Sequence, residues 1–174
     1  AGDVLDRSGR TLASTDELGA RVYAADRTLR LASAHALGDN TGQAIGAQSL
    51  FAKYLLGFDA GLGARLDALL SGEKRRGADI VLTIDAKLCE YAYSLLDGRS
   101  GAIVVMNYKT GEILAMTSAP SFDPSKIAKP SYEPEAGSLV NRVTPGRYTP
   151  GSTVKLITTV AALRYLPNAQ SRTF

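Results

Sequence analysis

A serine and a lysine three positions apart, Ser152 and Lys155, are the residues whose types and spacing best fit a chemical reaction. In a helix, residues three apart share a face, and at about 1.5 Å of rise per residue the two lie roughly 5 Å apart along the axis. A serine hydroxyl needs a base to take its proton, and a lysine can serve only when burial lowers its pKa. The spacing predicts a nucleophile with its own base. The alternative is a helix N-cap beside a solvent-exposed lysine.

The residues around this pair predict a helix that begins near Ser152 and ends before Pro167. A Pro-Gly pair precedes it, and residues 152–166 contain neither proline nor glycine. Apolar side chains surround the segment almost completely, which is typical of a helix buried in a larger domain. We therefore expect Lys155 to be partly desolvated, and the free N–H groups at the helix start to stabilise negative charge beside Ser152.

Three elements that would support this helix are predicted before it. Residues 80–83 form a short strand, and Asp85 is a good N-cap for a helix that ends near Leu96. Two apolar runs, 102–106 and 113–116, then form a hairpin. Runs this apolar favour strands covered on both faces, at the centre of a sheet with helices packed on it.

The start of the chain predicts a small extended unit. Val4 and Leu5 lead into a turn at residues 6–9, residues 10–12 return as a strand, and residues 21–24 can pair with it.

Residues 28–78 are harder to interpret. Helical patches at 29–37 and 50–70 are interrupted by glycines, and the basic run Lys74-Arg75-Arg76 favours a solvated turn. His35 has no acidic or nucleophilic neighbour in sequence, so we interpret it as a surface or locally hydrogen-bonded residue.

A long irregular connection is predicted at residues 118–146, which contain five of the seven prolines. Phe122 and Tyr132 are expected to anchor it to the core. Asn141 and Arg142, near its end, fit either a surface polar pair or a part of the site.

Composition indicates an ordinary domain with a real core: 174 residues, 45% hydrophobic and 21% charged. No apolar run is long enough to span a membrane and no signal peptide opens the chain. The net charge of +3 is mild and scattered, so nucleic acid is not an expected partner. With one His and one Cys a metal site is not expected, and Cys89 is predicted to be a buried thiol.

Three blocks, in order, resemble the class B penicillin-binding proteins. The last, Tyr148-Thr-Pro-Gly-Ser-Thr-Val-Lys155, contains the Ser-x-x-Lys motif of penicillin-binding proteins and class A β-lactamases. The segment that begins at Gly111 and runs Glu-Ile-Leu-Ala-Met-Thr-Ser-Ala-Pro-Ser-Phe-Asp-Pro124 is similar to the one that precedes the active-site helix in that family. The first block, Gly2-Asp-Val-Leu-Asp-Arg-Ser-Gly-Arg-Thr-Leu-Ala13, is similar to its opening motif.

This resemblance implies an α/β (α+β) chain in two parts. Residues 1–78 would form a non-catalytic pedestal, and residues 79–174 the first, incomplete part of a transpeptidase domain with a mixed sheet. The implied reaction is acyl transfer in peptidoglycan cross-linking, in which Ser152 attacks stem peptides ending in D-Ala-D-Ala, Lys155 takes its proton, and β-lactams are trapped. No cofactor is implied.

The resemblance also implies a membrane glycan polymerase as partner, an N-terminal membrane anchor outside this sequence, and an extracytoplasmic location. The family's Lys-Thr-Gly motif follows the active-site helix, whereas Lys109-Thr110-Gly111 precedes it and is interpreted as a turn; no Ser-x-Asn occurs. We therefore expect a truncated chain, inactive alone. The alternatives are a non-catalytic interaction module of a cell-wall complex, and a β-lactam sensor or β-lactamase.

Overall fold

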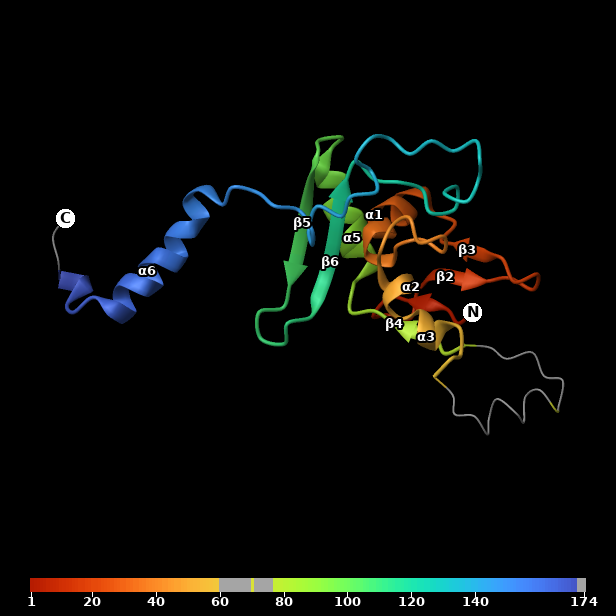
Figure 1. Cartoon of the computed structure of the whole chain (residues 1–174), viewed down its shortest axis with the longest axis horizontal. Helices are drawn as coiled ribbons and strands as arrows, with labels where there is room; N and C mark the ends of the chain where they lie inside the picture. The colour runs from red at the N-terminus through yellow and green to blue at the C-terminus, as the bar shows by residue number, and fades with distance from the viewer. Residues whose placement is uncertain (60–69, 71–76, 172–174) are drawn as a thin grey trace.

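The computed structural model describes residues 1–59, 70 and 77–171. It contains a body with two small sheets and their helices, from which one helix extends as an arm (Figure 1). The mixed α+β fold agrees with the sequence prediction. The basic run at 74–76 and residues 60–69 of the helical patch at 50–70 lie outside the described residues.

The first sheet has the strand order β3-β2-β1-β4. Its strands are β1 (Val4–Leu5), β2 (Thr11–Thr15), β3 (Arg21–Tyr23) and β4 (Ile80–Val81). β1 pairs antiparallel with β2, which pairs antiparallel with β3, as predicted for the start of the chain. β4 pairs with β1 in parallel, with Val4 opposite Ile80.

The turn between β1 and β2 is held by a buried carboxylate. One oxygen of Asp6 accepts hydrogen bonds from Ser8 N (2.8 Å), Ser8 Oγ (2.7 Å) and Arg10 N (2.8 Å). The other accepts from Ala86 N at 3.1 Å. Asp6 therefore fixes both the turn and the start of the helix at Ala86.

Capping residues delimit the two longer helices of the body. The Asp26 side chain accepts from Leu29 N at the start of α1 (Arg27–Leu37), and two short helices follow, α2 (Ala47–Leu50) and α3 (Ala52–Leu55). Asp85 caps α5 (Ala86–Leu96) in the same way. The helix ends at Leu96, as predicted, and is followed by Asp97 in a left-handed conformation.

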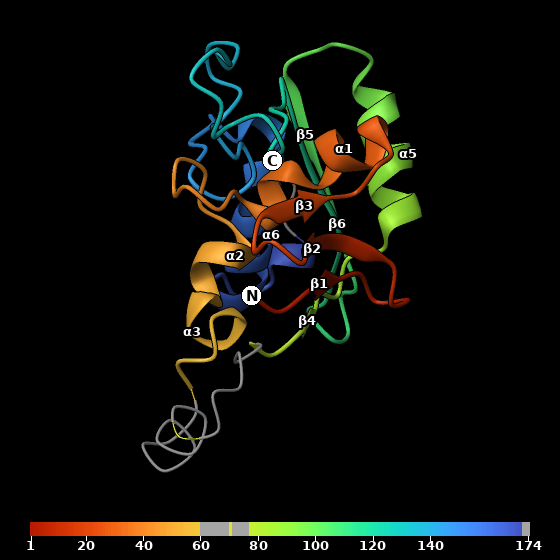
Figure 2. The same ribbon diagram turned by 90° about the vertical axis from the view of Figure 1, so that its right-hand side faces the viewer.

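The second sheet is the predicted hairpin, β5 (Gly101–Met106) and β6 (Ile113–Ala119). Helices α1 and α5 pack against each other and on β6 (Figure 2). The opposite face is open: Val104 is 44% and Met106 58% exposed. The prediction that both faces are covered is wrong for the described chain, because no element packs on this side of β5.

The main hydrophobic cluster draws on both parts of the chain. It joins strands β1 and β2, helix α1, helix α5 and β6; its buried members include Val4, Leu12, Leu29, Ala86, Cys89 and Ala115. Cys89 is a buried thiol as predicted, and burial raises its pKa to about 11. The division at residue 78 stays a prediction, and this cluster lies across it.

The predicted helix after the irregular connection forms almost where expected. A single 3₁₀ turn, η1 (Gly151–Thr153), leads into α6 (Val154–Tyr165), and η2 (Ala169–Ser171) follows. No residue of α6 is buried; Leu156 is 75% and Ile157 70% exposed. The prediction of a buried helix is wrong in this structure, because the helix projects from the body and none of the described elements covers it (Figure 1). No described helix is both long and apolar enough to span a bilayer.

Candidate active site

Ser152 lies in the 3₁₀ turn and Lys155 in the first turn of α6. Gly151 takes the positive φ of 55° that glycine tolerates, and Thr153 bonds back to the Pro150 carbonyl, so the chain turns sharply just at the serine. The structure therefore sets hydroxyl and amine at the start of one helix. Their catalytic roles stay predictions.

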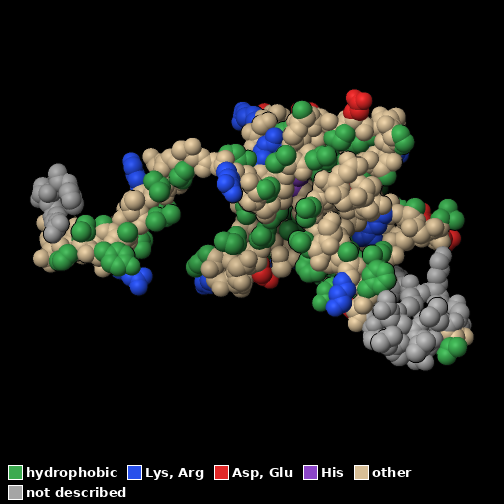
Figure 3. Space-filling model, viewed as in Figure 1, with side chains coloured by type: hydrophobic (Ala, Val, Ile, Leu, Met, Phe, Trp, Pro, Cys, Tyr) green, Lys and Arg blue, Asp and Glu red, His purple; other side chains and the backbone are tan. Residues whose placement is uncertain are grey.

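The surroundings of the pair are open. Both residues are exposed, and among the described residues no hydrogen bond joins the Ser152 hydroxyl to the Lys155 amine. Figure 3 shows hydrophobic side chains, with Lys and Arg among them, on the helical part of the arm. The predicted desolvation of Lys155 is absent here, because its apolar neighbours face solvent instead of a domain interior.

The Lys-Thr-Gly sequence of residues 109–111 lies in the turn of the hairpin. The Asn107 side chain accepts from Lys109 N at 3.0 Å, and Gly111 N donates to the Asn107 carbonyl at 2.8 Å. Gly111 has φ 78°. The interpretation as a turn is confirmed.

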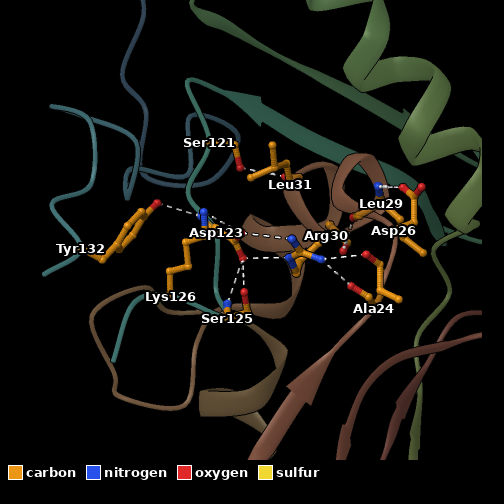
Figure 4. A network of polar contacts seen from close by, with 12 residues as sticks. Ala24, Asp26, Leu29, Arg30, Leu31, Ser121, Asp123, Ser125, Lys126 and Tyr132 are labelled. Carbon is orange, nitrogen blue, oxygen red and sulfur yellow. Dashed lines mark hydrogen bonds and ion pairs between the residues drawn. The ribbon is translucent and has the colours of Figure 1, made fainter. Parts of the chain in front are cut away.

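The irregular connection is attached to α1 by contacts that the sequence only partly predicted. Phe122 is fully buried and the Tyr132 hydroxyl accepts from Asp123 N at 3.0 Å, so both act as the expected anchors. The ion pair between Arg30 and Asp123 was not predicted (Figure 4). Arg30 also donates to the Ala24 carbonyl at 2.8 Å.

His35 differs from its sequence interpretation. It is only 2% exposed, its Nε2 lies 2.7 Å from the Ser138 carbonyl oxygen, and its ring meets the Phe122 ring edge-on at 5.4 Å. Burial lowers its pKa, and Arg142 lowers it further, while the Ser138 bond opposes the change. A signal was available, because His35 lies three positions after the buried Ala32 and therefore next to it on the helix surface.

Asn141 and Arg142 are partly buried and form hydrogen bonds to other segments of the chain, so they are not simply a polar pair on the surface. The Asn141 amide donates to the His35 carbonyl and to Met116 Sδ, both at 3.4 Å, and its oxygen accepts from Val143 N at 3.0 Å. Arg142 N donates to Ser118 Oγ at 3.2 Å.

Several hollows lie on the body of the molecule. One of about 610 Å³ lies beside β5 and is lined by residues that include Val104, Arg142 and Tyr148, the last of them four positions before Ser152. One of about 520 Å³ lies between the start of α1, the end of α5 and the irregular connection; another of about 360 Å³, mostly apolar, is lined by His35, Phe51, Met116 and Asn141 among others. The described residues include no group of three or more His, Cys, Asp or Glu placed to hold a metal ion.

Comparison with known proteins gives a consistent result. Residues 101–165 match the family described as penicillin binding protein transpeptidase domain. The chain is 43% identical over 95 residues to peptidoglycan D,D-transpeptidase MrdA of Escherichia coli (50% of this chain, 15% of that protein). It is 36% identical over 118 residues to PbpA of Mycolicibacterium smegmatis (59% of this chain, 24% of that protein).

Solved structures extend the similarity to almost the whole chain. Penicillin-binding protein A from Mycobacterium tuberculosis matches with TM-score 0.78 and 27% identity over 96% of this chain and 42% of that one. Pseudomonas aeruginosa PBP2 in complex with WCK 5153 matches with TM-score 0.72 and 31% identity over 93% and 38%. Residues 101–165 therefore resemble the transpeptidase domain of penicillin-binding proteins, and the chain as a whole is similar in fold to penicillin-binding proteins. It spans less than a quarter of the length of the curated relatives it matches.

Proposed function

We propose that the protein is a peptidoglycan D,D-transpeptidase that works through an acyl-enzyme on Ser152. The observation that carries this proposal is the position of Ser152 and Lys155 at the start of α6, inside the segment that matches the transpeptidase family. Two further findings support it: the relatives MrdA and PbpA are named D,D-transpeptidases, and a matched structure of M. tuberculosis penicillin-binding protein A is an imipenem acyl-enzyme complex.

The chemistry follows from the two groups. The Ser152 oxygen attacks the penultimate carbonyl of a stem peptide ending in D-Ala-D-Ala, and Lys155 accepts the hydroxyl proton. The C–N bond breaks, terminal D-Ala leaves with a proton, and an ester to Ser152 remains. A neighbouring stem amine then attacks the ester and restores the serine. A β-lactam opens its ring in the first step and stays attached as an ester of Ser152. The amine released by the broken C–N bond cannot diffuse away, because it remains part of the same molecule.

The proposed setting completes the assignment. Residues 1–78 would serve as the pedestal and residues 79–174 as the opening part of the catalytic domain, with further chain covering α6 and desolvating Lys155. A membrane anchor, an extracytoplasmic location and a membrane glycan polymerase as partner belong to the same proposal. Nucleophile, base and backbone oxyanion donors need no cofactor.

The test uses the chain extended to the length of its relatives. We expect labelled penicillin to form a covalent adduct on Ser152, found by mass spectrometry, and Ser152→Ala to abolish it. Ser171→Ala, which removes another exposed hydroxyl from the same arm, should keep the adduct. An adduct that persists in Ser152→Ala would refute the assignment, and a wild-type protein without adduct would favour a non-catalytic interaction module.

A further inference from the structure

Within the described chain, the position of Ser152 relative to the body depends on the last point at which the chain is fixed. Among the described residues, no hydrogen bond or ion pair joins residues 144–171 to the rest of the molecule. The last fixed point before the nucleophile is residues 138–143, which are bonded to α1 and β6. Whatever holds residues 138–143 therefore determines where the arm leaves the body.

The attachment to α1 goes through one residue. The His35 ring bonds the Ser138 carbonyl at 2.7 Å, and the His35 main-chain carbonyl accepts from the Asn141 amide. Asn141 in turn accepts from Val143 N. Side chain and backbone of His35 thus hold the segment at two places.

The ring is restricted to one orientation and one tautomer. Because the partner of Nε2 is a carbonyl oxygen, Nε2 must carry the hydrogen. Nδ1 is buried and has no hydrogen-bond partner among the described residues, so a second proton there would have to be buried unpaired. Phe122 packs against the ring edge-on, which restricts its rotation. The charged group that acts on the ring is Arg142, a cation, which also opposes protonation.

We propose that His35 is a positioning residue for the nucleophile. By bonding Ser138 and Asn141, it holds residues 138–143 on the N-terminal helix α1, and this attachment determines the point from which the following residues lead to Ser152. The catalytic half of this inference rests on the proposed role of Ser152. The positional half concerns only residues 138–143.

Two variants of His35 separate the hydrogen bond from the side chain's bulk. His35→Leu removes the donor, and His35→Gln keeps an N–H in a similar place. We expect the amides of residues 138–143 to exchange hydrogen about tenfold faster in His35→Leu, the change expected for one lost buried hydrogen bond. We expect His35→Gln to stay within about threefold of wild type. This measurement uses the 174-residue chain and needs no catalysis.

The effect of His35 on Ser152 is tested by measuring the rate of penicillin acylation of the extended chain at saturating penicillin. The acylation rate of His35→Leu should fall about tenfold with little change in the half-saturating concentration, and His35→Gln should restore it. Asp123→Asn is the matched control, because it weakens another contact of α1 with the connection, 29 positions before Ser152, and should lower stability while leaving exchange at 138–143 unchanged.

The outcomes are separable. Unchanged exchange in His35→Leu overturns the proposal. Faster exchange with a normal acylation rate refutes the link to the nucleophile. If the extended wild-type protein forms no adduct at all, the proposed function fails, while exchange still decides whether His35 holds residues 138–143.

Discussion

Arg30 and Asp123, 93 positions apart in sequence, form a two-pronged ion pair, with Nε 2.8 Å from Oδ1 and Nη2 3.2 Å from Oδ2. Only 15% of the Arg30 side chain and 7% of the Asp123 side chain are exposed. The pair fastens the irregular connection to α1 soon after β6 ends (Figure 4).

Arg30→Met should lower the free energy of unfolding by about 3 kcal/mol, because it leaves the Asp123 carboxylate buried without its main partner. Urea denaturation followed by circular dichroism measures the change. Arg10→Met is the control: Arg10 pairs with Glu90 at 3.3 Å, but their side chains are 41% and 25% exposed, so the loss should be below about 1 kcal/mol. Equal losses in the two variants would contradict this prediction.

Stability should fall steeply below about pH 4. Burial alone would raise the pKa of Asp123, but the hydrogen bonds from Arg30 and Ser125 outweigh it and hold the pKa below its ordinary value. The pKa of Asp6 is lowered in the same way by Ser8 and the backbone, against the effect of burial. Since both pKa values are lower in the folded chain, their stabilisation is complete above the unfolded values and is lost as the pH falls through the folded ones.

His35 should add a smaller decline that starts at higher pH. Its folded pKa lies below the ordinary value because burial disfavours the charged ring, so the unfolded chain takes up a proton first as the pH falls through about 6.5. Melting temperatures from pH 8 to pH 2 should therefore show two phases. His35→Gln should remove the upper phase and Asp6→Asn should weaken the lower one; a wild-type profile flat to pH 4 would refute the role of His35.

Lys155→Ala, in the extended chain, should slow penicillin acylation by at least about 10²-fold, the typical cost of losing a general base. Lys155→Arg should not restore the rate, because guanidinium stays protonated. Stopped-flow fluorescence with a labelled penicillin gives the rate, and melting temperature checks that the fold is kept. Near-normal acylation of Lys155→Ala would remove this residue from the mechanism.

The Lys-Thr-Gly turn supplies a matched pair of variants. Lys109→Ala, in the same assay, should leave acylation nearly unchanged, because Lys109 lies in the hairpin turn. Gly111→Val should lower stability by about 1 kcal/mol or more through its positive φ, although a new Cβ there would meet no atom within 4 Å. Loss of β-lactam binding in a folded Lys109→Ala protein would contradict the prediction that Lys109 takes no part in the site.

The uncovered apolar arm should make the 174-residue chain self-associate. Leu156 and Ile157 are both at least 70% exposed, and apolar patches of this kind favour association. Size-exclusion chromatography with light scattering should detect oligomers that shrink in the Leu156→Glu, Ile157→Glu double variant. Thr158→Glu adds a charge to the same helix without removing apolar surface, and should have a weaker effect. A monomeric wild type at high concentration would refute the prediction.

Sequence reasoning succeeded where the deciding residues are neighbours. The N-cap at Asp85, the end of the helix near Leu96 and the turn at Gly111 each depend on a few adjacent positions, and all three were predicted. The placement of Ser152 and Lys155 at a helix start was likewise local.

The contacts that were missed join distant segments. Nothing near Arg30 in sequence identifies Asp123 as its partner, and the burial of His35 requires Phe122 and Ser138 to be folded over it. For α6, the apolar character was predicted correctly. What would cover the helix could not be predicted, because hydrophobic periodicity shows which face a helix can bury and does not identify the element that packs on it.

The parallel pairing of β1 with β4 has a consequence for the order in which the chain folds during synthesis. Val4 cannot acquire its neighbour Ile80 until about eighty residues have emerged, and closing so long a loop is entropically costly and slow. The β5–β6 hairpin needs only adjacent residues. Until residues 80–86 have been synthesised, β1 can therefore pair only with β2. The sheet is completed, and Asp6 accepts its hydrogen bond from Ala86, only after that point.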